Sequence, residues 1–372
     1  MSLSPEVAAC PRCPIEAIEV RAYTIPTQSP ESDGTLEWDS TTLVYVEVHA
    51  GGARGIGYTY ADVATAKLIE TILRECLLHE DAMKIGARWN DMARVTRNLG
   101  RGGITSMAIS AVDVALWDLK GKIVEQPVFA LLGAARDRVA VYGSGGFTAY
   151  SEAQLCAQLG GWVRDGIPRV KMKIGRDAKG DIERVAAARR TIGPETELFV
   201  DANGAYAVQE AISQAQRFAE QSVTWFEEPV FREDYAGTRV VRQHAPPGME
   251  ISDGEYGYGL YDFARMIDCG MLDVLQADAT RCGGFSGLLA VDGLCQSTMT
   301  PLSTHCAPHL HLHAAMACKR LRHVEYFFDH SRIERMLFEG STDPENGYLY
   351  PDPARPGIGL SLRRADAERY AV

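Results

Sequence analysis

The sequence lacks several features that would assign it to other classes of protein. No apolar run approaches the ~20 residues needed to cross a bilayer, and the first residues lack the long apolar core of a secretion signal. Lysine and arginine together number 38, against 49 aspartates and glutamates, for a net charge of −11. Such a chain as a whole does not attract nucleic acid or anionic lipid. We therefore expect a cytoplasmic protein that binds neither nucleic acid nor membrane.

A disulfide framework is also missing. The nine cysteines are odd in number and scattered from Cys10 to Cys318, whereas secreted scaffolds carry denser and usually even sets. Cys10 and Cys13 form a CxxC pair, but no second pair follows that would complete a zinc site. We expect residues 1–13 to be a solvated, disordered leader without a chemical role.

Hydrophobic residues make up 46% of the 372 positions, enough for a large core and more than one domain. Two β-rich runs, 15–24 and 42–50, indicate a hairpin or meander, and the polar, turn-rich stretch 26–40 between them is predicted to be a surface loop. Helical periodicity then predicts three helices, at 64–79, at about 83–96 and at 104–122. Strands followed by helices are typical of an α+β domain, which we place at residues 1–136.

A different pattern runs from residue 137 to 345, where eight short β-rich runs alternate with amphipathic helices. The runs cover 139–142, 169–174, 197–201, 223–226, 249–252, 273–276, 300–303 and 322–325. Eight such units predict a (β/α)₈ barrel, for which the α+β domain serves as a cap. A doubly wound sheet would need GxGxxG after its first strand, and Gly143-Ser144-Gly145-Gly146 lacks that spacing. Residues 346–372 cannot form a ninth unit and are expected to return to the cap.

Ionisable residues fall at the carboxyl ends of seven consecutive predicted strands. They are Lys171, Lys173, Asp201, Glu227, Glu228, Glu255, Asp278, His305 and Glu325. In a barrel these ends all open on one face, which is where catalytic residues of this fold lie. The pattern therefore predicts an active site at that face.

Three of these residues, Asp201, Glu227 and Glu255, offer hard oxygen ligands from neighbouring strands. Such a set suits one Mg²⁺ ion, which prefers oxygen ligands and keeps places for water or substrate. Without a cation the three carboxylates would repel one another. Asp253 lies two residues before Glu255 on the same strand face and is an alternative ligand at this stage.

Lys171 and Lys173 are two residues apart, so both side chains point to the same side of their strand, into the barrel mouth. Neighbouring ammonium groups lower each other's pKa, which favours one of them as a general base.

Asp278 and His305 follow adjacent predicted strands. A carboxylate that bonds one imidazole nitrogen orients the ring and leaves the other nitrogen free to handle a proton. His309, His311 and His313 follow closely, but they open a predicted helix and are not expected to form a metal site.

These motifs, which cover nearly the whole chain, resemble the mandelate racemase/muconate lactonizing enzyme family, the mandelate racemase subgroup of the enolase superfamily. The matching segments are AISAVDVALWDLKGKIVEQPVFALLG from Ala108, VKMKIG from Val170, VDAN from Val200, WFEEP from Trp225 and the pair Gly254-Glu255.

The resemblance implies roles for individual residues. It implies one Mg²⁺ per active site, held by Asp201, Glu227 and, in preference to Asp253, Glu255. Lys173 and His305 would act as acid or base on opposite faces of the α-carbon of a carboxylate substrate, with Asp278 as partner of His305. The resemblance also implies that Ser144, Lys171, Asn203 and Glu325 bind the substrate and its enediolate. Glu228 would lie behind the metal ligands, and the chains would assemble into dimers or octamers.

One segment departs from the pattern of mandelate-specific members. Their first capping loop is apolar, whereas residues 27–40 here are mostly polar, with Trp38 the single aromatic. The departure favours a polyhydroxylated acid and hence a sugar-acid dehydratase that forms a 2-keto-3-deoxy acid. A racemase or epimerase of 2-hydroxy acids and an aldarolactone cycloisomerase are the alternatives. Arg97 and Arg101 either meet a second substrate carboxylate or are solvated.

Two functions from other classes are also compatible with parts of the pattern. A Schiff-base enzyme could use Lys171 or Lys173 as nucleophile, but it would not require three carboxylates. A non-catalytic scaffold could keep the fold, but it would be expected to lose at least one member of the constellation.

Overall fold

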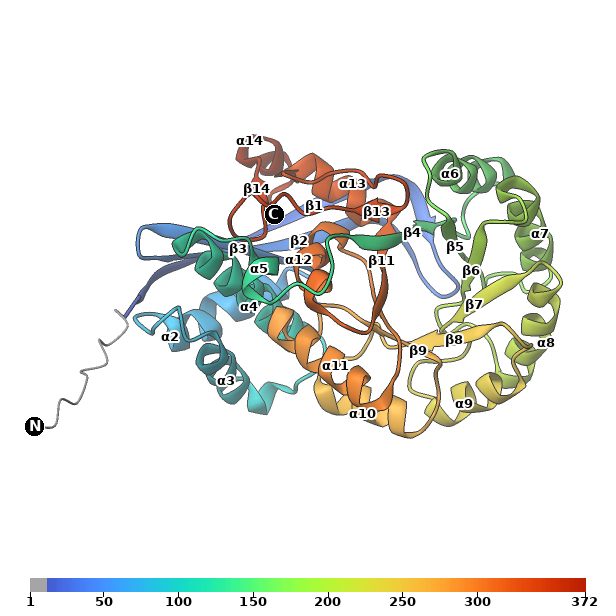
Figure 1. Ribbon diagram of the computed structural model, residues 1–372, viewed down its shortest axis with the longest axis horizontal. Coiled ribbons are helices and arrows are strands. Elements are labelled where there is room, and N and C mark those ends of the chain that lie inside the picture. Colours follow the sequence, from blue (N-terminus) through green and yellow to red (C-terminus); the bar gives the residue numbers. More distant parts are fainter. Residues whose placement is uncertain (1–11) are drawn as a thin grey trace, which may run out of the picture.

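The computed structural model describes residues 12–372, and its larger part is a closed barrel of eight parallel strands (Figure 1). The strands are β4 (Val139–Gly145), β5 (Arg169–Lys173), β6 (Glu197–Asp201), β7 (Val223–Glu227), β8 (Glu250–Asp253), β9 (Val274–Ala277), β10 (Leu302–Thr304) and β11 (Leu321–Phe327). Each strand pairs with the next, and β11 pairs with β4 to close the ring. The predicted barrel is confirmed, with strand ends within three residues of the predicted ones.

Eight helices surround these strands. They are α6 (Glu152–Arg164), α7 (Gly180–Ile192), α8 (Val208–Ala219), α9 (Tyr235–His244), α10 (Leu260–Asp268), α11 (Gly284–Thr298), α12 (Pro308–Ala317) and α13 (Phe328–Leu337). In α8 the buried residues Ala211, Ala215 and Phe218 recur at helical spacing, so one face packs on the sheet while the other meets solvent.

The inside of the barrel has two layers of different chemistry. Tyr142, Phe199, Trp225 and Val274 form a buried apolar floor, in which the rings of Phe199 and Trp225 stack 5.1 Å apart. Because side chains alternate along a strand, the next inward residue lies two positions further on, nearer the mouth. Phe199 is thus followed by Asp201, on the same side of β6. The floor therefore supports a polar layer directly above it.

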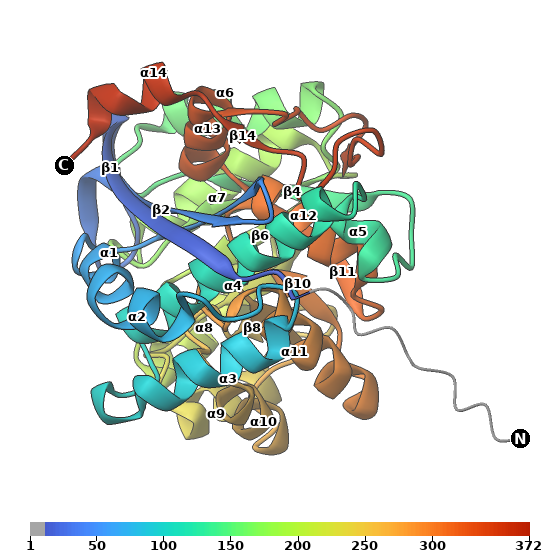
Figure 2. The same cartoon turned by 90° about the vertical axis from the view of Figure 1, so that its left-hand side faces the viewer.

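The cap consists of a three-stranded antiparallel sheet with helices on one side (Figure 2). Its strands are β1 (Ile15–Ser32), β2 (Glu37–Ala50) and β3 (Ala53–Tyr60). Its helices are α1 (Ala64–Leu68), the π-helical turn η1 (Ile69–Leu73), α2 (Arg74–Leu77), α3 (Ile85–Val95), the 3₁₀ turn η2 (Arg97–Leu99), α4 (Ile104–Ile123) and α5 (Val128–Leu131). Helix α4 packs closely on β3, where a side chain at Gly57 would meet the Ala111 carbonyl oxygen at 2.1 Å.

The prediction of a surface loop at residues 26–40 is wrong. Strand β1 continues to Ser32, β2 begins at Glu37, and Glu31, Ser32 and Asp33 are buried. The polar residues are buried because the hairpin tip lies against the barrel. There the Thr148 amide donates to the Ser32 carbonyl oxygen at 2.8 Å, and the Thr148 hydroxyl donates to the Asp33 carbonyl oxygen at 2.7 Å.

Gly34 permits the close contact between this hairpin tip and the barrel. A Cβ atom there would lie 2.3 Å from the Ala202 carbonyl oxygen and 2.8 Å from that of Ile174. We expect Gly34→Ala to lower the free energy of unfolding by about 1–3 kcal/mol, the usual cost of overpacking. The Thr148 amide should also exchange with D₂O faster.

A matched control for this substitution is Gly86→Ala in α3, where a Cβ atom would meet nothing within 4 Å. Alanine there should be neutral or add about 0.5–1 kcal/mol of stability, because glycine is a poor helix former. Equal denaturation midpoints for the two variants would contradict the tight contact at Gly34.

The C-terminal segment lies against both parts of the molecule. Strand β13 (Tyr348–Leu349) pairs with β4 of the barrel, and β14 (Ser361–Leu362) pairs with β12 (Phe338–Glu339). After helix α14 (Arg364–Ala367) and the 3₁₀ turn η3 (Glu368–Tyr370), the Val372 amide donates to the Ala22 carbonyl oxygen of β1 at 3.1 Å. These contacts bring the end of the chain back to the cap, as expected.

Asp118 in α4 joins three parts of the structure. Its buried carboxylate accepts hydrogen bonds from the amides of Ile56 and Ile358, each at 2.7 Å, and from Lys122 Nζ at 2.6 Å. Asp118→Ala leaves these donors without an acceptor, and each buried donor without a partner costs about 1–3 kcal/mol of stability. We expect the free energy of unfolding, measured by chemical denaturation, to fall by about 3–5 kcal/mol. Asp39→Ala, at an exposed position, should change the same quantity by no more than about 0.5 kcal/mol.

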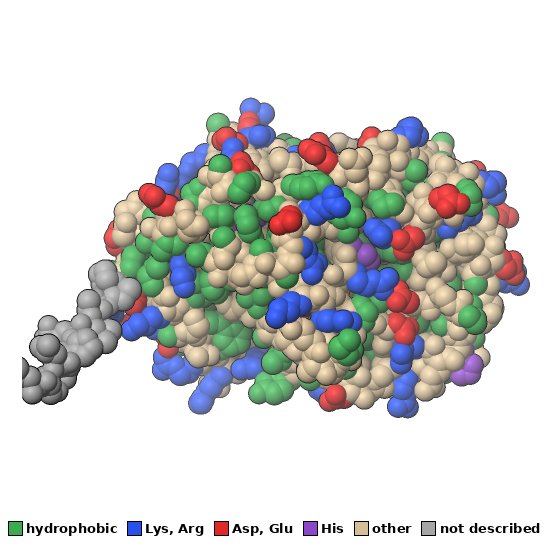
Figure 3. Space-filling view, viewed as in Figure 1, with side chains coloured by type: hydrophobic (Ala, Val, Ile, Leu, Met, Phe, Trp, Pro, Cys, Tyr) green, Lys and Arg blue, Asp and Glu red, His purple; other side chains and the backbone are tan. Residues whose placement is uncertain are grey.

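The surface carries charged side chains of both signs. Acidic and basic side chains are interspersed over the face shown in Figure 3. Among residues 12–372, no helix combines the length and the apolar character that crossing a membrane requires. Cys10 and most of the predicted leader lie outside the described residues.

Candidate active site

Three acidic residues meet at the mouth of the barrel. Asp201 ends β6, Glu227 ends β7 and Glu255 follows β8, and their ligand oxygens lie within 4.8 Å of one another in a buried position. Glu255 Oε2 accepts no hydrogen bond, although His305 Nε2 lies 3.2 Å away. Three buried carboxylates this close need positive charge between them, so this donor set fits a hard divalent cation.

Two further acids, Glu228 and Asp253, lie beside this group but outside it. Glu228 Oε1 and Asp253 Oδ2 are buried without hydrogen-bond partners. Burial and the charge of Glu255 raise the pKa of Glu228 well above its usual range and the pKa of Asp253 to about 8. The geometry thus brings Glu255 rather than Asp253 to Asp201 and Glu227.

Both strand-β5 lysines reach into the carboxylate group. Lys171 Nζ contacts Glu227 Oε1 and lies 2.8 Å from Glu325 Oε1 and 3.5 Å from Asp201 Oδ2. Lys173 Nζ donates to Asp201 Oδ2 at 2.5 Å. The two ammonium groups therefore offset part of the negative charge in the mouth.

The expectation that the pKa of one strand-β5 lysine is lowered is wrong when only the protein's own charges act on it. Burial and the like charge of Lys171 do lower the pKa of Lys173. The surrounding carboxylates, above all Asp201, raise it more, so the net pKa of Lys173 lies above the usual value. The spacing of the two lysines does not reveal the acids that face them, and these acids reverse the direction of the pKa shift.

Asp278 and His305 form a hydrogen-bonded pair. Asp278 Oδ2 lies 2.9 Å from His305 Nδ1, and the Thr280 amide donates to Asp278 Oδ1 at 2.7 Å. Burial alone would raise the pKa of Asp278, but the hydrogen bond and charge of His305 hold it well below the usual value. An ionised Asp278 keeps the proton of His305 on Nδ1, which leaves Nε2 to face the mouth.

The remaining predicted residues lie around this cluster. Glu325 Oε2 accepts from the Cys306 amide at 2.7 Å. Ser144 Oγ and Asn203 Oδ1 are buried without hydrogen-bond partners. The backbone N–H of Asn203 donates to Asp201 Oδ1 at 2.9 Å. All the residues predicted for the site thus come together at one end of the barrel, and Ser144, Asn203 and Glu255 keep polar atoms without partners.

The three histidines of α12 have contacts of other kinds. His309 Nδ1 lies 2.7 Å from Glu334 Oε2, and His311 Nε2 accepts from the Ala279 amide at 2.8 Å. His313 lies against Phe129, with ring centroids 5.5 Å apart. These contacts fasten α12 to α13 and to the segment that follows Asp278, so the three histidines have structural partners.

A cavity of about 400 Å³ lies between this cluster and the cap. The cap contributes Asp33, Trp38, Ser40, Thr41, Thr42, Tyr60, Ala61 and Asp62; the barrel side contributes Lys173, Asn203, Glu255, Tyr256, Arg281, His305, Cys306, Phe327 and His330. Substrates of small molecular size fit such a volume.

Sequence reasoning missed several residues at this cavity. Arg281 Nη1 donates to the Glu255 carbonyl oxygen at 3.1 Å and lies 3.5 Å from its carboxylate. His330 stacks on Tyr60, with ring centroids 3.5 Å apart. The position of Arg281, three residues after Asp278, could have suggested it; nothing in the sequence marks His330, because it enters from the helix after β11.

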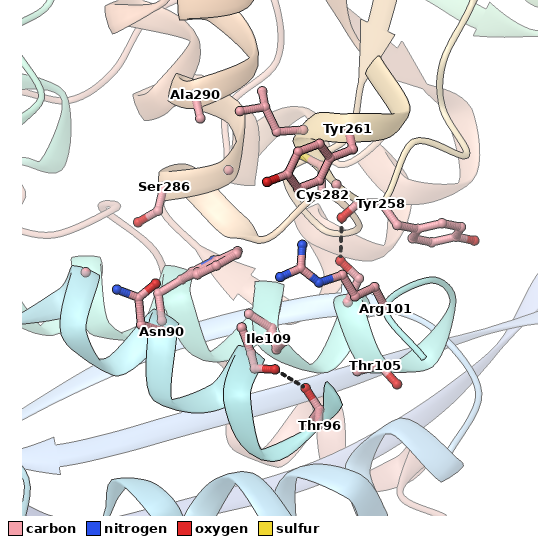
Figure 4. Close-up of a pocket in the computed structure, with 17 residues that line it drawn as sticks. Asn90, Thr96, Arg101, Thr105, Ile109, Tyr258, Tyr261, Cys282, Ser286 and Ala290 are labelled. Carbon is pink, nitrogen blue, oxygen red and sulfur yellow. Dashed lines mark hydrogen bonds between the residues drawn. The ribbon is translucent and has the colours of Figure 1, made fainter. Parts of the chain in front are cut away.

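A second cavity, of about 480 Å³, lies between the cap helices and α11, away from this cluster (Figure 4). Arg101 lines it together with Thr105, Ile109 and Tyr261. Neither Arg101 nor Arg97 lines the cavity beside His305. The idea that these arginines meet a second carboxylate of the substrate is therefore not supported by their positions.

Comparison with known proteins agrees with this architecture. Residues 17–133 match the family description of the mandelate racemase/muconate lactonizing enzyme N-terminal domain, and residues 154–367 match the enolase C-terminal domain-like description.

The similar proteins include a 3,6-anhydro-α-L-galactonate cycloisomerase of Streptomyces coelicolor, 34% identical over 96% of this chain and 99% of the relative. A mandelate racemase/muconate lactonizing enzyme-like protein from Rubrobacter xylanophilus has a crystal structure that superposes with a TM-score of 0.95, at 50% identity over 97% of this chain and 100% of the other.

L-Talarate/galactarate dehydratase from Salmonella typhimurium, liganded with Mg and L-lyxarohydroxamate, superposes with a TM-score of 0.91 at 27% identity. The match covers 100% of this chain and 96% of the other. The matched segments span both the cap and the barrel that carry the site. This chain belongs to the mandelate racemase/muconate lactonizing enzyme family of the enolase superfamily.

Proposed function

We propose that this protein is a Mg²⁺-dependent enzyme that removes the proton α to a carboxylate and stabilises the enolate, and that it dehydrates a sugar acid to a 2-keto-3-deoxy acid. The observation that carries the proposal is the buried group of Asp201, Glu227 and Glu255, with Lys173 on one side and His305 on the other. The family supports it, because one member with known structure is a dehydratase liganded with Mg.

Asp201, Glu227 and Glu255 would hold the metal. Bound Mg²⁺ supplies positive charge that offsets the negative charge developing on the substrate carboxylate. Ser144 and Asn203 each have a buried polar atom without a partner, available for hydrogen bonds to a substrate. Lys171, close to Glu325, adds a further positive charge at the same place. An acid as weak as the α-carbon requires this stabilisation before a side-chain base can act.

Proton transfer is then divided between two residues. Lys173 Nζ takes the α-proton once it is neutral, which requires that the charge of Asp201 be shared with a cation. His305 Nε2 delivers a proton to the departing 3-hydroxyl group, and Asp278 stabilises the imidazolium before transfer. Removal of the α-proton and loss of water together give an enol that becomes the 2-keto-3-deoxy acid.

Cycloisomerisation is the second candidate, favoured by the relative at 34% identity that carries this activity. It would use the same α-proton chemistry, with an intramolecular ether or ester oxygen as leaving group in place of hydroxide. Racemisation needs both Lys173 and His305 to exchange protons with the α-carbon. Cytoplasmic location and assembly into dimers or octamers stay predictions.

A substrate screen tests the proposal. We expect that one or more five- or six-carbon sugar acids will form a 2-keto acid in the presence of Mg²⁺, and that solvent deuterium will appear at C3 in D₂O. A 2-keto acid that is isomeric with its substrate, formed from a lactone or a cyclic ether without loss of water, would identify the cycloisomerase instead. Inversion at C2 without a keto product would identify a racemase.

A further inference from the structure

The charges around the cavity bear on the class of acid that it accepts, an inference that rests on the proposed function. We propose that the substrate is a monocarboxylate, with one carboxylate at the catalytic cluster and a neutral, hydroxylated distal end under the cap. Diacids such as aldarates, which carry a second carboxylate at that end, are rejected by charge.

The cap side of the cavity carries negative charge. Asp33 and Asp62 line it, and both are held in place by backbone donors: Asp33 Oδ1 accepts from the amides of Thr35 and Leu36 at 2.6 and 2.7 Å, and Asp62 Oδ1 accepts from the Ala64 amide at 2.8 Å. These bonds hold both carboxylates at the cap side of the cavity. A second substrate carboxylate near them would face like charge.

The positive charges of the cavity are at its other end and already have partners. Of the residues that line it, Lys173 and Arg281 carry cationic side chains. Lys173 Nζ bonds Asp201, and Arg281 lies within 3.6 Å of the carboxylates of both Glu255 and Asp278. Both cations therefore stay with the catalytic carboxylates, and neither reaches the cap as a free partner for a distal anion.

The rest of the cap lining suits a neutral polyol. Ser40, Thr41 and Thr42 bring hydroxyl groups to the cavity, while Trp38 and Phe327 bring aromatic surface. Hydroxyl groups exchange hydrogen bonds with sugar hydroxyls, and the C–H face of a sugar chain packs against aromatic rings. The hydroxyls of Ser40 and Thr41 donate to Asp39 and Asp329, so they keep acceptor lone pairs for the hydroxyl of a terminal CH₂OH. The described residues of the cap lining offer no cationic group to a terminal carboxylate.

Matched substrate pairs test this inference. The purified full-length protein with Mg²⁺ is assayed against the diastereomers of five- and six-carbon aldonates, each beside its aldarate, which differs only at the terminal carbon. Keto-acid formation and α-proton exchange in D₂O are both recorded. Because like charges at an interface are strongly unfavourable, we expect kcat/KM for the best aldonate to exceed that of its aldarate by about 100-fold or more.

Charge-removing variants connect the selectivity to the named residues. In Asp33→Asn with Asp62→Asn, each side chain keeps an oxygen that can accept the backbone hydrogen bonds. The aldonate-to-aldarate ratio should fall by about 10-fold or more. Asp39→Asn is the matched control, because it removes the same charge from an exposed position on the same hairpin outside the cavity; its ratio should equal that of the parent. If the double variant unfolds at a lower temperature than the parent, Asp62→Asn alone, at an exposed position, should still lower the aldonate-to-aldarate ratio about 3-fold.

The outcomes separate this inference from the proposed function. An aldarate that reacts as fast as its aldonate, or a ratio unchanged in the folded Asp62→Asn variant, overturns the monocarboxylate inference and leaves the dehydratase proposal standing. If no acid of either class forms a keto acid or exchanges its α-proton, the proposed function fails, and the inference fails with it.

Discussion

Lys173→Ala is expected to lose both keto-acid formation and α-proton exchange, with rates lower by about 10²–10⁴-fold, the usual effect of removing a general base. Lys173 Nζ is the amine nearest Asp201 in the mouth, and it lines the substrate cavity. Exchange is measured by NMR in D₂O and turnover by keto-acid release, with the substrate found in the screen.

His305→Asn provides the contrast to this loss. Asparagine roughly preserves the shape of the side chain but cannot transfer a proton at neutral pH, so turnover should fall by a similar factor. Lys173, Lys171 and the three carboxylates remain, so the α-proton should still exchange.

The pattern across the two variants decides between mechanisms. Normal turnover in His305→Asn would show that the Asp278–His305 pair is structural. Loss of exchange together with turnover in that variant would make His305 the base, and a syn elimination with one residue acting twice would then explain the reaction better. Melting temperatures of both variants, measured beside the parent, show whether the lost side chain affected folding.

Removing the metal is expected to abolish activity, and addition of Mg²⁺ to restore it. A metal ion that stabilises transition-state charge contributes several kcal/mol, which corresponds to about 10³-fold or more in rate. The ion should also stabilise the fold, because it binds only the folded arrangement of Asp201, Glu227 and Glu255. At a Mg²⁺ concentration about 100 times Kd, the unfolding free energy should rise by about 2.7 kcal/mol.

Glu227→Gln and Asp253→Asn test which acids bind the ion. The first substitution keeps the size of the side chain but offers a neutral oxygen, so calorimetric Mg²⁺ affinity should fall about 100-fold or more and the thermal stabilisation should disappear at the same concentration. Asp253 lies outside the three-carboxylate group, so its variant should lose no more than the roughly 10–100-fold typical of residues behind the ligands. The reverse order of effects would assign the metal to Asp253.

Borohydride treatment in the presence of substrate would separate this chemistry from that of a Schiff-base enzyme. A covalent adduct on Lys171 or Lys173, together with activity that survives EDTA, would contradict the metal-dependent mechanism.

The barrel and the ionisable residues at its mouth could be predicted from local pattern, whereas the choice of Glu255 over Asp253 came from the family resemblance. Short apolar runs that alternate with amphipathic helices identify βα units, and a residue that follows a parallel strand necessarily lies at the carboxyl edge of the sheet. Asp201, Glu227, Glu255 and His305 therefore had to lie near one another once the strands were counted, whatever the details of side-chain packing.

The path of the capping hairpin depended on tertiary contacts. Residues 26–40 are polar and read locally as a loop, but Ser32, Asp33 and Gly34 dock on the barrel, where Thr148 supplies hydrogen bonds that water would otherwise provide. Burial of polar residues follows from partners far away in the sequence, which no local pattern contains.

The sequence by itself determined the fold class, the types of ionisable residue at the mouth and their order around it, because strand order and side-chain alternation follow from local periodicity. Tertiary structure alone decided the direction of the lysine pKa shifts, the entry of Arg281 and His330, and the meeting of Asp33 and Asp62 at one cavity. Electrostatic interactions depend on distance and burial, and both are set by contacts between segments remote in the chain.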